Sequence, residues 1–252
     1  MTPLYGRVAL VTGSSRGIGA AIAKVFASAG AAVVVHGRDA DAVAAVTARI
    51  NETGGRALAA IADLTSYEQI EAMRDTIEER LGPVDILVAN AGGSFTPPAP
   101  LEEIPEDGWR ATVDGNLLAT FLTMKSFLPG MKDRGRGVII TISSAAGRRP
   151  HPQSPIPYGA AKAGIALLTQ DVAAQAGPFG IRVNCIAPET ILTERNRERI
   201  PSESQATMAN WHPLKRLGTP DDVANTAAFL ASAEAAWLTG LVVDVAGGAV
   251  MV

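Results

Sequence analysis

Short runs of consecutive apolar residues alternate along the chain with longer stretches in which apolar positions recur every three or four residues. The first pattern is typical of a strand buried on both faces, and the second is typical of an amphipathic helix. The runs that predict strands cover residues 8–11, 31–36, 57–62, 86–89, 138–142, 181–186 and 240–245. The stretches that predict helices cover residues 18–29, 41–53, 67–81, 109–131, 158–176 and 219–231.

This alternation predicts an α/β fold in which a doubly wound parallel sheet carries helices on both faces. No repeat, linker or low-complexity tract interrupts it, so we expect one domain over residues 1–252. Two segments lie outside the alternation, residues 92–103 and 189–214. Both follow the carboxyl ends of predicted strands, where open α/β sheets bind ligands. They are the expected walls of a substrate pocket, with a lid near residues 190–214.

The composition narrows the classes of protein that fit this pattern. With 47% hydrophobic and 19% charged residues, the chain is an ordinary globular protein and not a disordered one. The net charge is −3 and no run of Lys or Arg occurs, which argues against nucleic-acid or membrane partners. The first apolar run leads directly into glycines, as a strand does and a signal peptide does not. We therefore expect a cytoplasmic protein, with its single Cys185 as inert core and no metal site.

A glycine-rich segment follows the first predicted strand and opens the first predicted helix, with the sequence Thr12-Gly13-Ser14-Ser15-Arg16-Gly17-Ile18-Gly19. Its glycines permit a tight turn and a close approach of the backbone to a pyrophosphate, whose charge would face the helix N-terminus. The strand before it and the helix after it predict a dinucleotide site. The spacing, T-G-x-x-x-G-x-G, differs from the G-x-G-x-x-G of the commonest dinucleotide folds.

Tyr158 and Lys162 lie four residues apart in a predicted helix, so their side chains share one helical face. A fixed ammonium group beside a phenol favours the phenolate and lowers the phenol pKa from its usual value near 10. Such a pair also occurs commonly on surface helices. Its meaning therefore depends on the rest of the chain.

The glycine-rich loop, Asn90-Ala91-Gly92, Asn116, Ser144 and the Tyr158–Lys162 pair together resemble the short-chain dehydrogenase/reductase family, over essentially the whole chain. Within that family the chain is most similar to the 3-oxoacyl-carrier-protein reductase group. The resemblance implies a single Rossmann-type domain, with a cofactor half near residues 1–135 and a catalytic and substrate half near residues 136–252. It also implies hydride transfer between a nicotinamide cofactor and a carbonyl or secondary alcohol.

The resemblance implies catalytic roles for four residues. Tyr158 would protonate the carbonyl oxygen, and Lys162 would lower the phenol pKa and hydrogen-bond the nicotinamide ribose. Ser144 would hydrogen-bond the substrate oxygen, with Ser143 as its rival. Asn116 would open its own helix locally and hold a water between Lys162 and solvent.

The resemblance also implies a set of cofactor contacts. The adenine edge is expected at Asp63 and Leu64. The other expected contacts are Gly13, Ser15, Arg16, Ile18, Gly19, Arg38, Asn90, Ala91, Gly92, Tyr158, Lys162, Pro188, Ile191 and Thr193.

The end of the second predicted strand bears on the choice of cofactor. Gly37 stands where NAD-preferring relatives carry Asp, and Arg38 with Arg16 offers guanidinium groups suited to a 2′-phosphate. This favours NADP(H) over NAD(H). In the alternative, Arg38 is a solvated surface charge and Asp39 serves NAD.

Four residues are expected in the substrate pocket. His151 would lie beside the substrate as a specificity or structural residue, because the tyrosine and lysine already supply acid and base. Glu189 stands where the family usually has glycine, and Glu would be strained there if the backbone needed positive φ, so we expect a slightly altered turn. The expected pocket residues are Phe95, His151, Met208 and Trp211.

The leading functional hypothesis is an NADP(H)-dependent reductase of a ketone or a 3-oxoacyl thioester. One alternative is an NAD-dependent catabolic dehydrogenase of an alcohol, sugar or steroid. The other is a non-enzymatic nucleotide-sensing regulator, against which the complete set of four catalytic residues argues. The resemblance further implies a homo-oligomer, a tetramer or a dimer.

Overall fold

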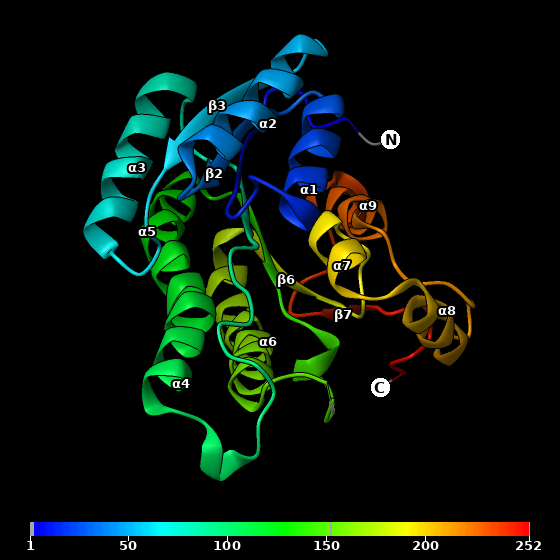
Figure 1. Ribbon diagram of the computed structural model, residues 1–252. Coiled ribbons are helices and arrows are strands. Elements are labelled where there is room, and N and C mark those ends of the chain that lie inside the picture. Colours follow the sequence, from blue (N-terminus) through cyan, green and yellow to red (C-terminus); the bar gives the residue numbers. More distant parts are fainter. Residues whose placement is uncertain (1–2, 152, 252) are drawn as a thin grey trace.

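A computed structural model describes residues 3–151 and 153–251. In this part of the chain seven strands form one sheet, in the order β3-β2-β1-β4-β5-β6-β7 (Figure 1). Every pairing between them is parallel. The predicted doubly wound parallel sheet is therefore confirmed. The strands are β1 (Val8–Val11), β2 (Ala32–Gly37), β3 (Arg56–Ile61), β4 (Ile86–Ala89), β5 (Gly137–Ile142), β6 (Ile181–Pro188) and β7 (Val242–Val245).

Helices cover both faces of the sheet (Figure 1). One face carries α1 (Gly17–Ser28), α2 (Ala40–Glu52) and α9 (Pro220–Ala231). The other carries α3 (Tyr67–Leu81), α5 (Ala119–Arg134) and α6 (Ile156–Ala176), with α4 (Glu106–Val113) preceding α5. Two further helices, α7 (Glu194–Arg199) and α8 (Ser202–Trp211), form the predicted lid segment after β6.

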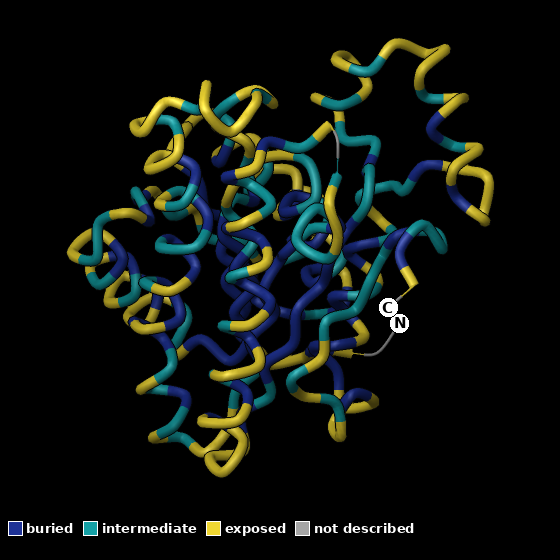
Figure 2. Tube along the Cα trace, turned by 90° about the horizontal axis from the view of Figure 1, so that it is seen from below, coloured by how far each residue is buried: buried dark blue, intermediate teal, exposed yellow. Residues whose placement is uncertain are grey.

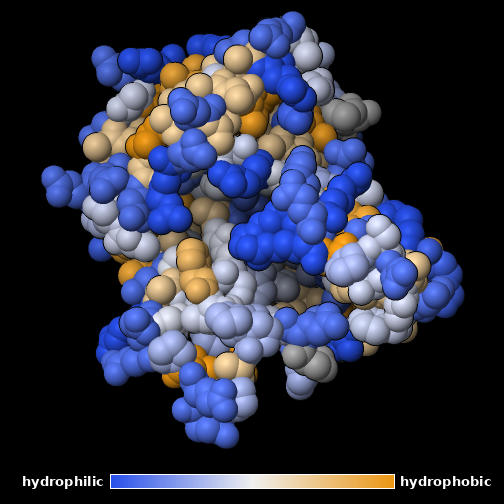
Figure 3. Space-filling model, viewed as in Figure 1, coloured by the Kyte–Doolittle hydropathy of each residue, from blue (hydrophilic) through white to orange (hydrophobic). Residues whose placement is uncertain are grey.

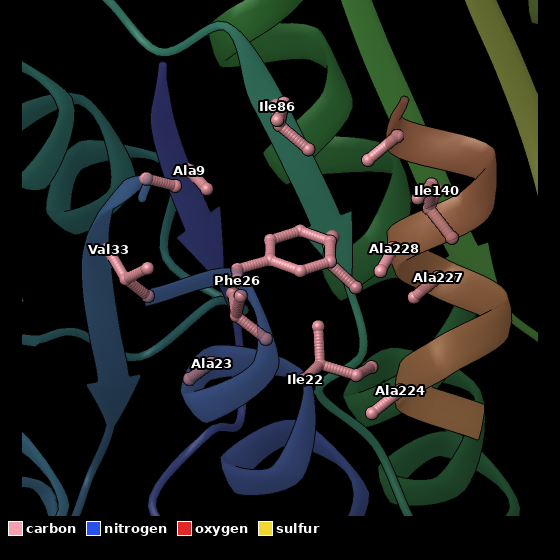
Figure 4. Close-up of a cluster of buried hydrophobic side chains, with 14 of the residues drawn as sticks. Ala9, Ile22, Ala23, Phe26, Val33, Ile86, Ile140, Ala224, Ala227 and Ala228 are labelled. Atoms are coloured by element: carbon pink, nitrogen blue, oxygen red, sulfur yellow. The ribbon is translucent and has the colours of Figure 1, made fainter. Parts of the chain in front are cut away.

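The strands read as continuous apolar runs because both of their faces are buried. Ala9 and Val11 of β1 pack into the core beneath α1 and α9, whereas Val8 and Leu10 pack into the core beneath α3, α5 and α6. Figure 2 shows this buried trace through the centre of the molecule, with exposed turns around it. Phe26 of α1 is fully buried and lies among alanines of α9, whose small side chains let the two helices approach closely (Figure 4).

Several element boundaries differ from the predicted ones. The predicted helix 109–131 consists of α4, a π-helical turn at Asp114–Leu118, and α5. The helix that carries Tyr158 begins two residues earlier, at Ile156, and β7 begins two residues later than predicted, at Val242. α9 begins as predicted with a capping box, in which Asp222 accepts a hydrogen bond from the Thr219 amide at 2.7 Å. None of the helices in the described ranges combines the length and apolar character needed to cross a bilayer.

Candidate active site

Two adjoining cavities open at the carboxyl ends of the strands, where the chain order reverses between β1 and β4. The first cavity, of about 1050 Å³, is bounded by the glycine-rich loop, by the loops after β4, β5 and β6, and by α7. The second, of about 790 Å³, lies between residues 94–98, residues 144–146 and α7. Ser144, His151 and Tyr158 line both cavities. These residues therefore stand where the two spaces meet.

The glycine-rich loop is tied to the end of β4. The Asn90 amide nitrogen donates to the Thr12 carbonyl at 2.9 Å and to the Gly13 carbonyl at 3.1 Å. In return, the Thr12 hydroxyl accepts the backbone N–H of Asn90 at 3.0 Å and that of Ala91 at 3.1 Å. Asn90 and Ala91 thus hold the loop in shape.

The first turn of α1 has the geometry of an anion site. A Cβ at Gly19 would collide with the Gly13 carbonyl and would lie 2.6 Å from the Asn90 amide nitrogen, so no side chain fits there. The N-cap residue of α1, Arg16, makes no side-chain capping bond. Free backbone N–H groups and close backbone packing beside a cavity suit the pyrophosphate of a dinucleotide. The residues present therefore fit a nicotinamide cofactor.

His36, at the end of β2, is a residue of the cofactor loop that sequence reasoning missed. Its Nδ1 accepts the Gly13 N–H at 3.1 Å, so Nε2 carries the proton and donates to the Ala62 carbonyl at 3.1 Å. Burial lowers the pKa of His36 to about 4, so the ring is neutral at pH 7. The one available signal was a polar side chain within an apolar strand that borders the loop.

Lys162 is a buried cation at the base of the site, with 3% of its surface exposed. Its ammonium donates to the Ile142 carbonyl at 2.8 Å and lies 5.6 Å from the centroid of the Tyr158 ring. Burial lowers the pKa of Lys162 to about 8, because the charged form is desolvated. The lysine backbone is also fixed, since the Ser143 hydroxyl donates to the Lys162 carbonyl at 2.7 Å.

Tyr158 and Ser144 are the polar pair shared by the two cavities. Burial raises the pKa of Tyr158, and a hydrogen bond with Ser144 opposes that rise. The sequence predicted that Lys162 would lower the pKa of Tyr158, but in the structure this pKa is raised. Loss of hydration disfavours the phenolate more than its neighbours favour it. Ser144 lines both cavities, whereas Ser143 lines the first alone and commits its hydroxyl to Lys162. Ser144 is thus the serine better placed for a substrate oxygen.

Asn116 is fully buried within the π-helical turn. Its side-chain amide donates to the Thr112 carbonyl at 2.7 Å and to the Gly93 carbonyl at 2.8 Å. Its carbonyl oxygen accepts the Gly93 N–H at 3.1 Å. The predicted local opening of the helix is therefore present, and Asn116 joins it to the loop after β4.

The predicted cofactor residues fall into two groups. Those that do not line the first cavity are Arg38, Asp63, Leu64 and Ala91. Arg38 is exposed, Asp63 accepts a hydrogen bond from the Thr65 amide in a turn, and Leu64 packs in the core. Those that line it are Gly13, Ser15, Arg16, Ile18, Gly19, Asn90, Gly92, Tyr158, Lys162, Pro188, Ile191 and Thr193.

Three of the four predicted pocket residues line a cavity. Phe95 lines the second, Met208 lines the first, and His151 lines both. Trp211 lines neither of them, because it ends α8 with 59% of its surface exposed to solvent. Among residues 3–151 and 153–251, no group of three or more His, Cys, Asp or Glu side chains is placed to hold a metal ion.

His151 and Glu189 form a hydrogen-bonded pair that lines both cavities with Tyr158, which spacing could not reveal. The imidazole Nε2 lies 3.2 Å from a carboxylate oxygen, and the Glu189 side chain is 8% exposed. The hydrogen bond to Glu189 raises the pKa of His151. Burial alone would raise the pKa of Glu189, but the bond and charge of His151 and the charges of Arg149 and His212 together hold that pKa below its usual value. Glu189 is not at positive φ, since Lys215 is the one non-glycine residue with positive φ in the described chain, which agrees with the expected alteration of the turn.

Comparison with known proteins places this site among oxidoreductases. Residues 13–250 match the family model described as enoyl-(acyl carrier protein) reductase. The chain is 39% identical over 247 residues to 7alpha-hydroxysteroid dehydrogenase of Escherichia coli strain K12, covering 98% of this chain and 95% of that protein.

Two solved structures share the fold closely. The 3-oxoacyl-[acyl-carrier protein] reductase of Brucella melitensis, with bound NAD, is 37% identical with a TM-score of 0.92, covering 99% of this chain and 93% of that one. The gluconate 5-dehydrogenase of Burkholderia cenocepacia, in complex with NADP and tartrate, is 35% identical with a TM-score of 0.91, covering 98% of this chain and 96% of that one. The present chain belongs to the short-chain dehydrogenase/reductase family and is an oxidoreductase with the Rossmann-type fold of that family.

Proposed function

We propose that the protein is an NADP(H)-dependent reductase that converts a ketone or a 3-oxoacyl substrate into a secondary alcohol. The observation that carries this proposal is the meeting of Ser144 and Tyr158 at the junction of two cavities, one of them bounded by a dinucleotide-type loop. Asn116, Ser144, Tyr158 and Lys162 are all held by the fold, which disfavours a regulator without catalysis.

Each polar residue of the site has a physical task in this reaction. A nicotinamide cofactor held at the glycine-rich loop would supply the hydride for the carbonyl carbon. Ser144 donates a hydrogen bond to the carbonyl oxygen, where negative charge develops. Tyr158 transfers its phenolic proton to that oxygen, so the alcohol leaves neutral. The Lys162 ammonium, 5.6 Å from the ring centroid, stabilises the phenolate that remains. At pH 7 the lysine is mainly charged, because its pKa is about 8.

The choice of NADP(H) rests on the end of β2. A Cβ at Gly37 would lie 2.9 Å from Val43 Cγ2, so the aspartate typical of NAD-preferring relatives would require Val43 to shift. Asp39 is already engaged, since it caps α2 at 3.1 Å from the Ala42 amide and lies 3.3 Å from Arg16. Arg38 is exposed beside them and makes no ion pair within the described residues. This arrangement supports recognition of a 2′-phosphate by a guanidinium group.

The exposed surfaces of α5 and α6 support assembly into a homo-oligomer, a dimer or a tetramer. Phe121 of α5 is 44% exposed and Leu167 of α6 is 60% exposed. Large apolar side chains on neighbouring helices are typical of a surface that a second copy covers. We include this assembly in the proposal.

The test is the oxidation of NADPH and NADH over a panel of ketones, 3-oxoacyl thioesters and sugars, with Tyr158→Phe as the diagnostic variant. We expect Tyr158→Phe to lower kcat by about 10²–10⁴-fold, because it removes the proton donor, and to leave the Kd for NADPH within a few-fold. Tyr5→Phe is the matched control, since Tyr5 is 78% exposed.

Retained turnover in Tyr158→Phe would overturn the mechanism. Oxidation of alcohols with NAD⁺ and little reduction with NADPH would instead identify the catabolic dehydrogenase.

A further inference from the structure

The helix α7, which follows β6 (Figure 1), carries two arginines that line both cavities. Its sequence is Glu-Arg-Asn-Arg-Glu-Arg, and Arg195 and Arg199 stand four residues apart on one helical face. Both line the first and the second cavity, whereas Arg197, midway between them, lines neither. Figure 3 shows hydrophilic side chains gathered over this helix, in the middle of the face that carries the cavities.

The charge around the second cavity is unbalanced. Glu189 is the only acidic residue among its described lining residues, and it is paired with His151 at 3.2 Å. Within the described chain, neither Arg195 nor Arg199 takes part in an ion pair. The cavity wall therefore presents two guanidinium groups without a protein carboxylate to neutralise them.

The rest of the second cavity is built mainly from small and polar side chains. Phe95 and Tyr158 are its large aromatic residues, and three prolines and two alanines form the remaining apolar wall. The residues that bring hydroxyl or amide groups are Ser94, Thr96, Ser144, Gln153, Ser154, Thr190 and Asn196. This lining suits a small hydrogen-bonding substrate better than an extended apolar one.

We propose that Arg195 and Arg199 bind an anionic group of the substrate while Ser144 and Tyr158 hold its carbonyl. The substrate class is an oxo compound with a carboxylate or phosphate group, reduced to the corresponding hydroxy compound. Guanidinium groups match both anions by charge and by their planar fork of donors. This inference rests on the proposed reductase function, because it assigns the other end of the same substrate.

The cofactor pyrophosphate is a less suitable partner for these arginines. Glu194 and Glu198 line the first cavity and do not line the second, so the cofactor side of α7 carries carboxylates. The uncapped N-terminus of α1 already offers a site for the pyrophosphate. The unbalanced positive charge faces the substrate side.

The first experiment measures the reduction of three oxo acids and of their neutral methyl esters. The acids are 4-oxopentanoate, 5-oxohexanoate and 4-oxocyclohexanecarboxylate. Acetoacetyl coenzyme A is added as a substrate that carries phosphate groups. The variants are Arg195→Gln, Arg199→Gln, their double variant and the control Arg197→Gln. Loss of charged hydrogen bonds predicts that the acid-to-ester ratio of kcat/KM falls by about 10- to 100-fold in the double variant. Arg197→Gln should keep the ratio of the parent enzyme.

The two types of substrate distinguish a carboxylate from a phosphate as the bound anion. A fall confined to the acids identifies a free carboxylate, and a fall confined to the coenzyme A thioester identifies a phosphate. Equal losses of kcat/KM on acids and esters in the double variant would overturn the inference. It would also be overturned if the parent enzyme preferred the esters and the double variant kept its rate with the coenzyme A thioester. A weaker Kd for NADPH without any change in substrate ratio would also overturn it, since the arginines would then serve the cofactor.

The second experiment does not depend on turnover. Tartrate, a small hydroxy acid, is titrated by calorimetry into the NADP⁺-loaded enzyme and into the loaded double variant, at constant ionic strength. We expect binding by the parent enzyme and by Arg197→Gln, and loss of binding in the double variant. If tartrate binding depends on the arginines but the enzyme reduces none of the carbonyl substrates, the anion site is supported and the reductase proposal is wrong. Equal binding by all variants would overturn the anion site alone.

Discussion

At the scale of single residues, the proposed preference for NADP(H) depends on Arg38. Gly37 carries no side chain and Asp39 is engaged by Arg16, so Arg38→Asp should remove the 2′-phosphate partner and repel that phosphate. We expect the NADPH-to-NADH ratio of kcat/KM to fall by about 10- to 100-fold, the worth of a charge-assisted hydrogen bond. Steady-state kinetics with both cofactors measures it, with Arg49→Asp on α2 as control. An unchanged ratio would count against the 2′-phosphate role.

His36 makes the stability of the cofactor loop depend on pH. Its pKa is about 4 in the folded chain against 6.5 in the unfolded chain, so the unfolded state binds more protons between these values. The free energy of unfolding should therefore rise from pH 4 to pH 6.5, by up to about 3 kcal/mol from this group. Urea unfolding at pH 4.5, 5.5 and 7 tests this, with His36→Gln expected to show a flatter profile. Parallel profiles for the two proteins would contradict it.

At the scale of elements, hydrogen bonds of Asn116 connect the π-helical turn between α4 and α5 to the loop after β4. Asn116→Leu removes three hydrogen bonds to Gly93 and Thr112 and leaves buried backbone groups without partners. We expect it to lower the free energy of unfolding by about 2–4 kcal/mol and to speed hydrogen exchange at the Gly93 amide. Asn225→Leu on the exposed side of α9 is the matched control. If Asn116→Leu lowers the free energy of unfolding no more than Asn225→Leu does, the hydrogen bonds of Asn116 are not needed for stability.

At the scale of the whole molecule, the exposed apolar side chains of α5 and α6 predict self-association. Leu167→Glu places a charge on the surface that we assign to a second copy, and burying an unpaired charge is unfavourable. We expect sedimentation to show a dimer or tetramer for the parent chain and at least about tenfold weaker association for the variant. Leu101→Glu, at a site 66% exposed outside these helices, is the control. A monomeric parent chain would remove the assembly from the proposal.

The order of amino acids alone was sufficient for the fold and the main chemistry. Continuous apolar runs reveal the strands because burial on both faces of a sheet removes polar residues from them. The glycine-rich loop, Ser144, Tyr158 and Lys162 could be singled out because together, and in this order, they resemble the motifs of the short-chain dehydrogenase/reductase family. These signals are local, so spacing along the chain carries them.

The tertiary structure alone decided how side chains from distant elements meet. The bond of His36 to the loop, the pairing of His151 with Glu189 and the two arginines of α7 that line both cavities join positions far apart in sequence. The same holds for the raised pKa of Tyr158, because desolvation depends on everything packed around a group. Trp211 lies in the predicted lid, yet its exposure follows from where α8 ends. Burial and pairing are properties of packing in space, which the spacing of residues along a chain does not contain.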